Sequence, residues 1–301
     1  MEASSPASPP VAAAASTVAS PVVSLPALRA EIDRIDEAMH RLLMERGEII
    51  ARLIEVKRTA ETGSAFRPAR EADMMRRLVE RHHGILPLDT AESILRVIIA
   101  TFTYVQAPYR VHADLSTGEA AMRDSARFHF GFTVPFEGHL GVPGVFRALD
   151  GAHGDLGLVP ATSPSGGAWW TALEAPDAPK IIARLPFVER ADHPAGLPVF
   201  AVARPHPDAL VTEVRLYSVR VSGWSLKAAQ AAGMLAEVVA VPDGAFDGAA
   251  LLVSVPAGRT LEEVTAALIG AGASVRAQAM VGGHATRYTV SADGALVPTG
   301  H

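Results

Sequence analysis

Cationic and amide side chains recur at helical spacing in the first third of the chain. Arg46 interrupts an apolar stripe, and Lys57 follows about three helical turns later, so both point the same way to within ~20°. Arg70 and Glu71 form a pair farther along, and Gln106 continues the apolar face of a later helix. Together they would make a cationic pocket with one acceptor and one amide, which suits a small anionic ligand.

The stripe around Arg46 predicts one long helix packed along a seam. Its apolar members alternate spacings of four and three residues, and they are Leu28, Ile32, Ile35, Met39, Leu42, Ile49, Leu53 and Val56. A guanidinium is costly to bury without an anion. Arg46 therefore indicates either a structural ion pair with a glutamate or a site for a negative ligand. Taken alone, the ion pair is the commoner outcome.

Arg29 lies on the same predicted helix, roughly 25 Å from Arg46 along its axis. The two arginines cannot serve one small ligand within a single chain. In an antiparallel dimer, however, the start of one long helix lies beside the far part of the other. Arg29 would then complete the partner's site.

Three helices are needed to position these residues. They are predicted at about Ser24–Arg58, Pro68–His83 and Asp89–Gln106. Ser24 is suited to an N-cap, and Gly84 to a C-cap. The expected apolar faces of the shorter helices are Met74, Met75, Leu78 and Val79, then Ile94, Leu95, Ile98, Ile99, Phe102 and Val105. Because two short helices cannot cover a rod of roughly 50 Å, dimerisation through the long helix is expected.

The segment with these residues resembles the all-helical (type II) chorismate mutase family over residues 25–108. The matching motifs are Leu28-Arg29-Ala30-Glu31-Ile32-Asp33-Arg34-Ile35-Asp36, Glu45-Arg46, Val56-Lys57, Arg70-Glu71, Ile98-Ile99 and Gln106. The resemblance implies an intertwined homodimer with two sites, each borrowing one arginine from the partner. It also implies no cofactor and no metal.

The resemblance further implies roles for single residues. Arg29 of the partner and Arg46 would hold the two carboxylates of chorismate, while Lys57 and Gln106 would donate to its ether oxygen. Glu71 would accept from the ring hydroxyl, and Arg70 would order the adjoining loop. Two positions depart from the family pattern: Arg67 stands where an acidic residue is common, and Phe102 where a serine is common. Both departures affect hydroxyl recognition rather than the class of reaction.

Such donors suit the Claisen rearrangement of chorismate to prephenate. This reaction needs no nucleophile, general base or metal. The enzyme must fold a flexible dianion into a chair-like conformer, which fixed cations do by clamping. It must also stabilise negative charge growing on the ether oxygen, which preorganised donors do in a dry pocket.

Composition excludes several other classes of protein. The 301 residues carry a net charge of -5 and contain no cysteine. There is thus no basic bias toward nucleic acid, and disulfides, thiolate metal sites and cysteine nucleophiles are excluded. Residues 1–24 are rich in Ala, Ser and Pro and are expected to be a disordered tail rather than a signal peptide. No run is apolar for long enough to span a membrane, and a cytoplasmic location is expected.

Residues 109–301 change character and predict an α/β domain of sandwiched layers. Strands are expected near Phe128–Thr133, Leu156–Val159, Leu197–Val202, Val214–Val221, Val238–Val241, Leu251–Val255 and Arg287–Val290, and helices at Leu226–Leu235 and Thr260–Gly270.

This half faintly resembles prephenate dehydratase, to which chorismate mutases are often fused. The resemblance rests on two segments, Gly154-Asp155-Leu156-Gly157-Leu158-Val159-Pro160 and Thr286-Arg287-Tyr288. The second is similar to a Thr-Arg-Phe motif of that family. Thr162 and Ser163 stand where that family has an acid and an amide. We therefore expect a diverged domain that is inactive as a dehydratase and that binds an aromatic effector or only supports the dimer.

The leading prediction is a dimeric, cofactor-free chorismate mutase of phenylalanine and tyrosine biosynthesis. The first alternative is a bifunctional chorismate mutase/prephenate dehydratase. The second is not an enzyme but a helical dimerisation module that carries a small-molecule sensor domain.

Overall fold

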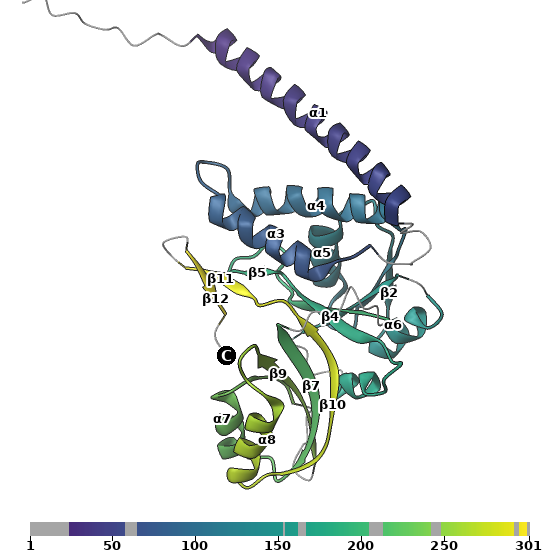
Figure 1. The fold of residues 1–301 in the computed structure, drawn as a ribbon, viewed down its shortest axis with the longest axis vertical. Helices are drawn as coiled ribbons and strands as arrows, with labels where there is room; N and C mark the ends of the chain where they lie inside the picture. Colours follow the sequence, from purple (N-terminus) through teal and green to yellow (C-terminus); the bar gives the residue numbers. More distant parts are fainter. Residues whose placement is uncertain are drawn as a thin grey trace, which may run out of the picture. The chain divides into compact units, whose positions relative to one another are not determined.

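The computed structural model describes residues 24–57, 65–152, 154–161, 167–204, 213–241, 248–291 and 295–299. The chain divides into two compact units, Met1–Ile49 and Ile50–His301. The described elements are α1 (Leu25–Lys57), α3 (Pro68–Arg81), α4 (Leu88–Gln106), β1 (Val111–Asp114), α5 (Glu119–Phe130), β2 (Phe136–His139), α6 (Val142–Leu149), β3 (Leu156–Pro160), the 3₁₀ helix η2 (Trp169–Leu173), β4 (Lys180–Leu185), β5 (Val188–Glu189), β6 (Val199–Ala203), β7 (Val214–Ser222), α7 (Leu226–Gly233), β8 (Glu237–Ala240), β9 (Ala249–Pro256), α8 (Leu261–Gly270), β10 (Ser274–His284), β11 (Tyr288–Val290) and β12 (Leu296–Pro298) (Figure 1).

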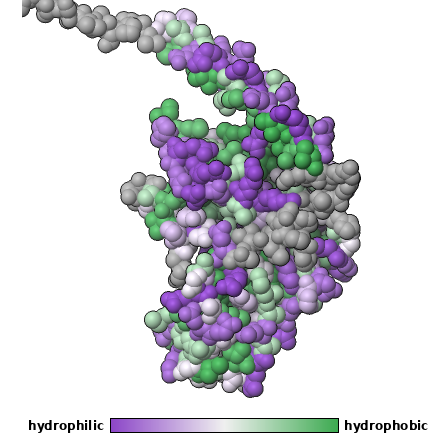
Figure 2. Space-filling view, in the orientation of Figure 1, coloured by the Kyte–Doolittle hydropathy of each residue, from purple (hydrophilic) through white to green (hydrophobic). Residues whose placement is uncertain are grey.

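The first unit contains the long helix α1 as far as Ile49, and the helix continues to Lys57, as the apolar stripe predicts. Ser24 caps it, since the Ser24 hydroxyl oxygen accepts from the backbone N–H of Ala27 at 3.3 Å. The stripe is open to solvent: Leu28, Ile32, Ile35, Met39, Leu42 and Ile49 each remain 44% to 58% exposed. Figure 2 shows apolar and polar residues side by side along this helix.

The second unit contains the two predicted shorter helices, α3 and α4. Met75 and Val79 of α3 are buried, as the pattern predicts. The face predicted for α4 is wrong in part, because Ile94 and Val105 are exposed, whereas Glu92, Arg96 and Thr103 are buried. Gly84 is not the C-cap of α3, since His82 ends that helix; Gly84 lies in the next turn with φ of +92°.

A nine-stranded sheet forms the centre of the second unit, with strand order β2-β1-β3-β6-β4-β10-β7-β9-β8. β1 pairs in parallel with β2 and β3, and most later pairs are antiparallel. β11, β12 and β5 make a small second sheet. The two regions of the large sheet meet where Gly282 of β10 pairs with Ile181 of β4. A Cβ at Gly282 would lie 2.1 Å from the carbonyl oxygen of Ile181, so only glycine allows this approach.

Residues 214–284 fold in the order β7-α7-β8-β9-α8-β10, and their strands lie in the order β10-β7-β9-β8. This is the split βαβ arrangement of ferredoxin-like folds. The helices α7 and α8 lie side by side against the sheet (Figure 1), and Ala228, Ala232, Val264 and Leu268 join its apolar core. The predicted helices and strands of this region are confirmed.

One predicted strand, Phe128–Thr133, is wrong. The alternation of Phe128, Phe130 and Phe132 resembles a strand, yet Phe128 and Phe130 lie in the last turn of helix α5. The buried residues of α5 recur at helical spacing, and they are Met122, Ser125, Ala126, His129 and Phe130. Gly131, with φ of +67°, then ends the helix.

The helices α3 and α4 share one core with the start of the α/β region. Met75 and Ile99 belong to the same apolar cluster as Tyr109, Val111 and Phe130. Pro108, at the boundary expected from the sequence, is exposed, while Tyr109 next to it belongs to this shared core.

Candidate active site

Two of the predicted ligand-binding arginines, Arg29 and Arg46, lie on α1. Arg29 is exposed and Arg46 is half-buried. Helix geometry separates them by roughly 25 Å. Within one chain, these two arginines are therefore too far apart on α1 to bind the same small ligand.

The other predicted residues lie in or next to the second unit. Lys57 is the last residue of α1, and its side chain lies outside the described part of the chain. Arg70 is exposed in the first turn of α3. Gln106 ends α4 half-buried, and its amide nitrogen donates to the carbonyl oxygen of Phe102 at 2.9 Å. Arg67, one of the two departures from the family pattern, precedes α3 and donates to the carbonyl oxygen of Phe66.

Glu71 is buried in an ion pair that the sequence analysis missed. Arg96 of α4 donates from Nη1 to Oε2 of Glu71 at 2.6 Å, and both side chains are at least 95% buried. The other guanidinium nitrogen, Nη2, donates to the carbonyl oxygen of His129 on α5 at 3.0 Å. The pair thus ties α3, α4 and α5 together. Gln106 lies about 15 Å beyond Arg96 along α4, so Glu71 and Gln106 are at different levels of the helix pair.

A second charged group joins α4 to the segment between β5 and β6. Arg190 forms an ion pair with Glu92 at 3.0 Å and another with Asp89. Glu92 also lies 3.6 Å from the imidazole of His193. Glu92 and Arg96 are four residues apart, so they line one face of α4. The four-residue spacing of Glu92 and Arg96 in an otherwise apolar helix was the sequence signal for a charged, buried face.

His129 lies beside this charged group. Burial, followed by the positive charge of Arg96, holds the pKa of His129 well below its ordinary value. A neutral His129 avoids adding a third cation to the buried cluster.

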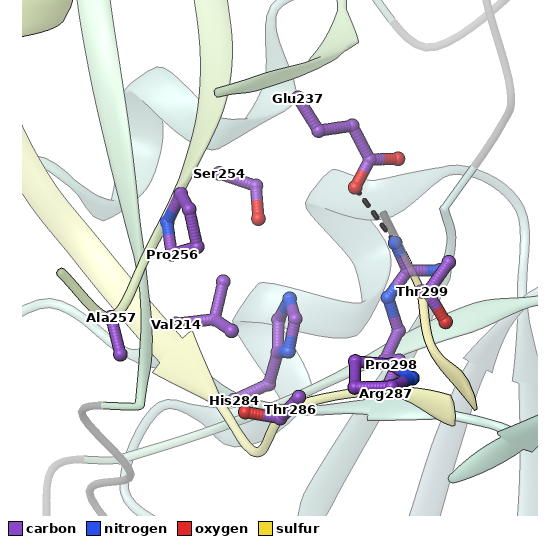
Figure 3. A pocket seen from close by; sticks show the side chains of 10 residues that line it. All are labelled: Val214, Glu237, Ser254, Pro256, Ala257, His284, Thr286, Arg287, Pro298 and Thr299. Carbon is purple, nitrogen blue, oxygen red and sulfur yellow. Dashed lines mark hydrogen bonds and ion pairs between the residues drawn. The ribbon is translucent and has the colours of Figure 1, made fainter. Parts of the chain in front are cut away.

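Thr286 and Arg287 of the motif Thr286-Arg287-Tyr288 line a cavity of about 160 Å³ next to the small sheet (Figure 3). Its arginine is already engaged: Nη2 of Arg287 donates to Glu237 at 2.8 Å, and Nη1 donates to Glu189. Arg184 also binds Glu237, at 3.0 Å. Thr162 and Ser163, the other residues weighed for dehydratase chemistry, lie outside the described residues.

His284 lies in the same cavity (Figure 3). Burial lowers its pKa to about 4, and the charges of Arg287 and Arg184 act in the same direction. Its Nδ1 lies 2.7 Å from the carbonyl oxygen of Ala285, so this nitrogen carries the proton and donates. The neutral ring leaves Nε2 as an acceptor.

The side chains that these helices carry, cations and an amide, are the residue types that the sequence predicts for a site that binds a small polyanion. The comparison with known families agrees, since residues 28–107 match the family model described as chorismate mutase type II. The resemblance expected for this segment is confirmed.

Curated relatives carry two activities in their names. A bifunctional chorismate mutase/prephenate dehydratase of Stutzerimonas stutzeri is 29% identical over 148 residues, which are 48% of this chain and 40% of that protein. One of Aquifex aeolicus is 30% identical over 137 residues, or 44% of this chain and 37% of that protein. One of Pseudomonas aeruginosa is 28% identical over 148 residues, with 48% and 40% covered. These alignments span less than half the length of each relative.

A solved structure, prephenate dehydratase from Streptococcus mutans, matches with a TM-score of 0.33 and 10% identity. It covers 58% of this chain and 97% of that chain. No described helix is long and apolar enough to cross a membrane.

Proposed function

We propose that the protein is a chorismate mutase that rearranges chorismate to prephenate by clamping the dianion. The observation that carries this proposal is the match of residues 28–107 to the type II family, over the segment that bears Arg29, Arg46 and Gln106. Arg46 and the partner's Arg29 hold the two carboxylates. Lys57 and Gln106 donate to the ether oxygen as the C–O bond breaks, and Arg70 orders the start of α3.

Glu71 accepts from the ring hydroxyl in this proposal, and its ion pair with Arg96 fixes the carboxylate in place. Arg96 occupies Oε2, which leaves Oε1 for the hydroxyl, and α3 and α4 must shift along each other for Glu71 and Gln106 to reach the same substrate. The pair thereby supplies an oriented acceptor without the freedom of an exposed glutamate.

The dimer is part of the same proposal, and the exposed stripe of α1 supports it. Six apolar side chains on one helix face remain open to solvent, whereas a soluble monomer keeps such patches small. A second copy in antiparallel orientation covers this face and brings Arg29 to the far end of the neighbouring helix. A cytoplasmic location also belongs to the proposal, as the default expected from the sequence.

The test of the proposed function is turnover of chorismate by the purified full chain. We expect loss of chorismate absorbance and equimolar formation of prephenate without added metal or cofactor. A folded dimer that leaves chorismate unchanged would refute the proposal and favour the alternative of a helical dimerisation module with a sensor domain.

A bifunctional mutase and dehydratase is the second candidate, and the names of the relatives favour it. The engaged Arg287 argues against it, because its guanidinium is bound by Glu189 and Glu237 rather than open to a substrate carboxylate. Phenylpyruvate formed from added prephenate would establish this second activity.

We expect the substitution Ile35→Glu to convert the dimer to a monomer, since it places a charge in the middle of the apolar stripe. The matched control is Ala30→Glu, which adds the same charge at an exposed position off the stripe. Sedimentation velocity measures the oligomeric state of both variants. If the Ile35→Glu variant remains a dimer, the dimer interface does not lie on this face of α1.

A further inference from the structure

Two histidines and a glutamate lie on one face of the sheet, at its β1–β2 edge. β1 and β2 are parallel, and His112 stands opposite Glu137 in the register. His139 follows Glu137 by two residues, so all three side chains point to the same face. None of them belongs to the site described above.

The ligand atoms of these residues are already close together. One ligand atom from each of His112, Glu137 and His139 lies within 4.8 Å of the others. Nδ1 of His112 is 3.0 Å from Nε2 of His139 and 3.5 Å from Oε2 of Glu137. Two ligands of a tetrahedral zinc ion at ordinary bond lengths lie about 3.3 Å apart. The two separations measured from His112 therefore differ from this spacing by a few tenths of an ångström, and the third pair of ligand atoms lies within 4.8 Å.

Asp155 orients the first histidine. Its Oδ2 lies 3.2 Å from Nε2 of His112, while its Oδ1 accepts from the backbone N–H of Arg110 at 2.8 Å. A proton on Nε2 of His112 then leaves the lone pair of Nδ1 directed at His139 and Glu137. A carboxylate behind a histidine in this way is the usual outer partner of metal-binding imidazoles.

The surroundings keep the cluster ordered but open on one side. His112 is 4% exposed, whereas His139 and Glu137 are partly exposed and give an ion a path from solvent. Helix α6 packs closely here, because a Cβ on Gly144 would lie 3.1 Å from Cβ of His139.

Two cations lie near the cluster. Arg110 pairs with Oε1 of Glu137 and leaves Oε2 facing His112. The exposed Arg147 acts on His139 only through its charge.

We propose that His112, His139 and Glu137 bind a divalent transition metal, with Zn²⁺ as the best fit, and that Asp155 positions His112 for this role. Two imidazole nitrogens with one carboxylate favour zinc and its neighbours over Ca²⁺ or Mg²⁺, which prefer oxygen ligands. Three protein ligands leave a fourth position for water or a small ligand. In the metal-free protein, the same two rings share a hydrogen bond, which the ion replaces.

The test is calorimetric titration of the EDTA-treated full chain with ZnCl₂, together with the visible spectrum of the Co²⁺ form. We expect one ion per chain at this site and the absorption of four-coordinate cobalt. His139→Ala and Glu137→Gln, at the exposed rim, should each weaken binding at least about tenfold, and Asp155→Asn by about 10–100-fold. His83→Ala, an exposed histidine elsewhere, should leave affinity unchanged.

Circular dichroism verifies that each variant is folded. Absence of zinc binding by the wild-type chain would overturn the proposal. Equal affinity in wild type, His139→Ala and Glu137→Gln would also overturn it, and would leave the ring-to-ring hydrogen bond as the only role of the pair. Both readouts are independent of chorismate turnover.

Discussion

Arg46→Ala is expected to lower kcat/KM for chorismate by about 10²–10³-fold, the loss typical when one preorganised donor is removed from a charged transition state. Arg46 is half-buried on α1, so the change opens no large cavity in the second unit. We expect folding to be kept while the clamp on one carboxylate is lost. Arg41→Ala is the matched control, because Arg41 is exposed on the same helix and lies off the stripe. Steady-state loss of chorismate absorbance measures both variants.

Arg46→Lys separates charge from geometry in the same assay. A lysine keeps the positive charge but cannot bind a carboxylate with two parallel hydrogen bonds. We expect an activity between those of wild type and Arg46→Ala. If Arg46→Ala is as active as Arg41→Ala, Arg46 is not part of the active site.

The shared-site arrangement gives this experiment a second stage. Arg29→Ala and Arg46→Ala protomers are each inactive alone, but a heterodimer holds one intact site, built from Arg46 of one chain and Arg29 of the other. Random exchange should restore about a quarter of wild-type activity, since half of the dimers are mixed and each has one working site. No recovery in verified heterodimers would argue against the shared site.

Periodicity predicted most of the helical segment because its helices have strong local signals. Ser24 caps α1, and the apolar spacing of the stripe fixes its face. The inner face of α4 was not predictable in the same way. Its exposed side carries apolar residues such as Ile94, while its buried side carries Glu92 and Arg96. Pattern reading assigns apolar residues to the interior, and only tertiary partners reveal which charges are buried.

The α/β region was harder to predict for a different reason. Strands β3 and β9 are largely apolar runs and β7 alternates apolar with polar residues, so all three were expected, whereas β1 and β2 were missed. β1 and β2 are four residues each and carry His112, Glu137 and His139, so no apolar run marks them. The proposed metal site could not be predicted from the sequence either. His112 lies far along the chain from Glu137 and His139, and only the parallel pairing of β1 and β2 brings them together.

Arg96→Met is expected to destabilise the second unit by about 3–5 kcal/mol, because it leaves the Glu71 carboxylate buried without its partner. Methionine keeps much of the volume, so the cost comes mainly from the lost charge and from the hydrogen bond to the carbonyl oxygen of His129. The guanidinium also lies 5.3 Å from the ring centre of Phe187, a contact that methionine can partly replace. Urea denaturation followed by circular dichroism measures the loss.

The double variant Arg96→Met/Glu71→Met decides whether an unpaired charge is the cause. Replacing both members of a buried ion pair by apolar residues is often neutral or stabilising, so we expect the double variant to recover most of the stability lost by Arg96→Met. A double variant as unstable as Arg96→Met would mean that packing around Arg96, rather than its charge, holds α3, α4 and α5 together. The recovered double variant should still lack full chorismate turnover, since it has no carboxylate to accept the ring hydroxyl. Stability and activity would thereby separate the structural role of the pair from the proposed catalytic role of Glu71.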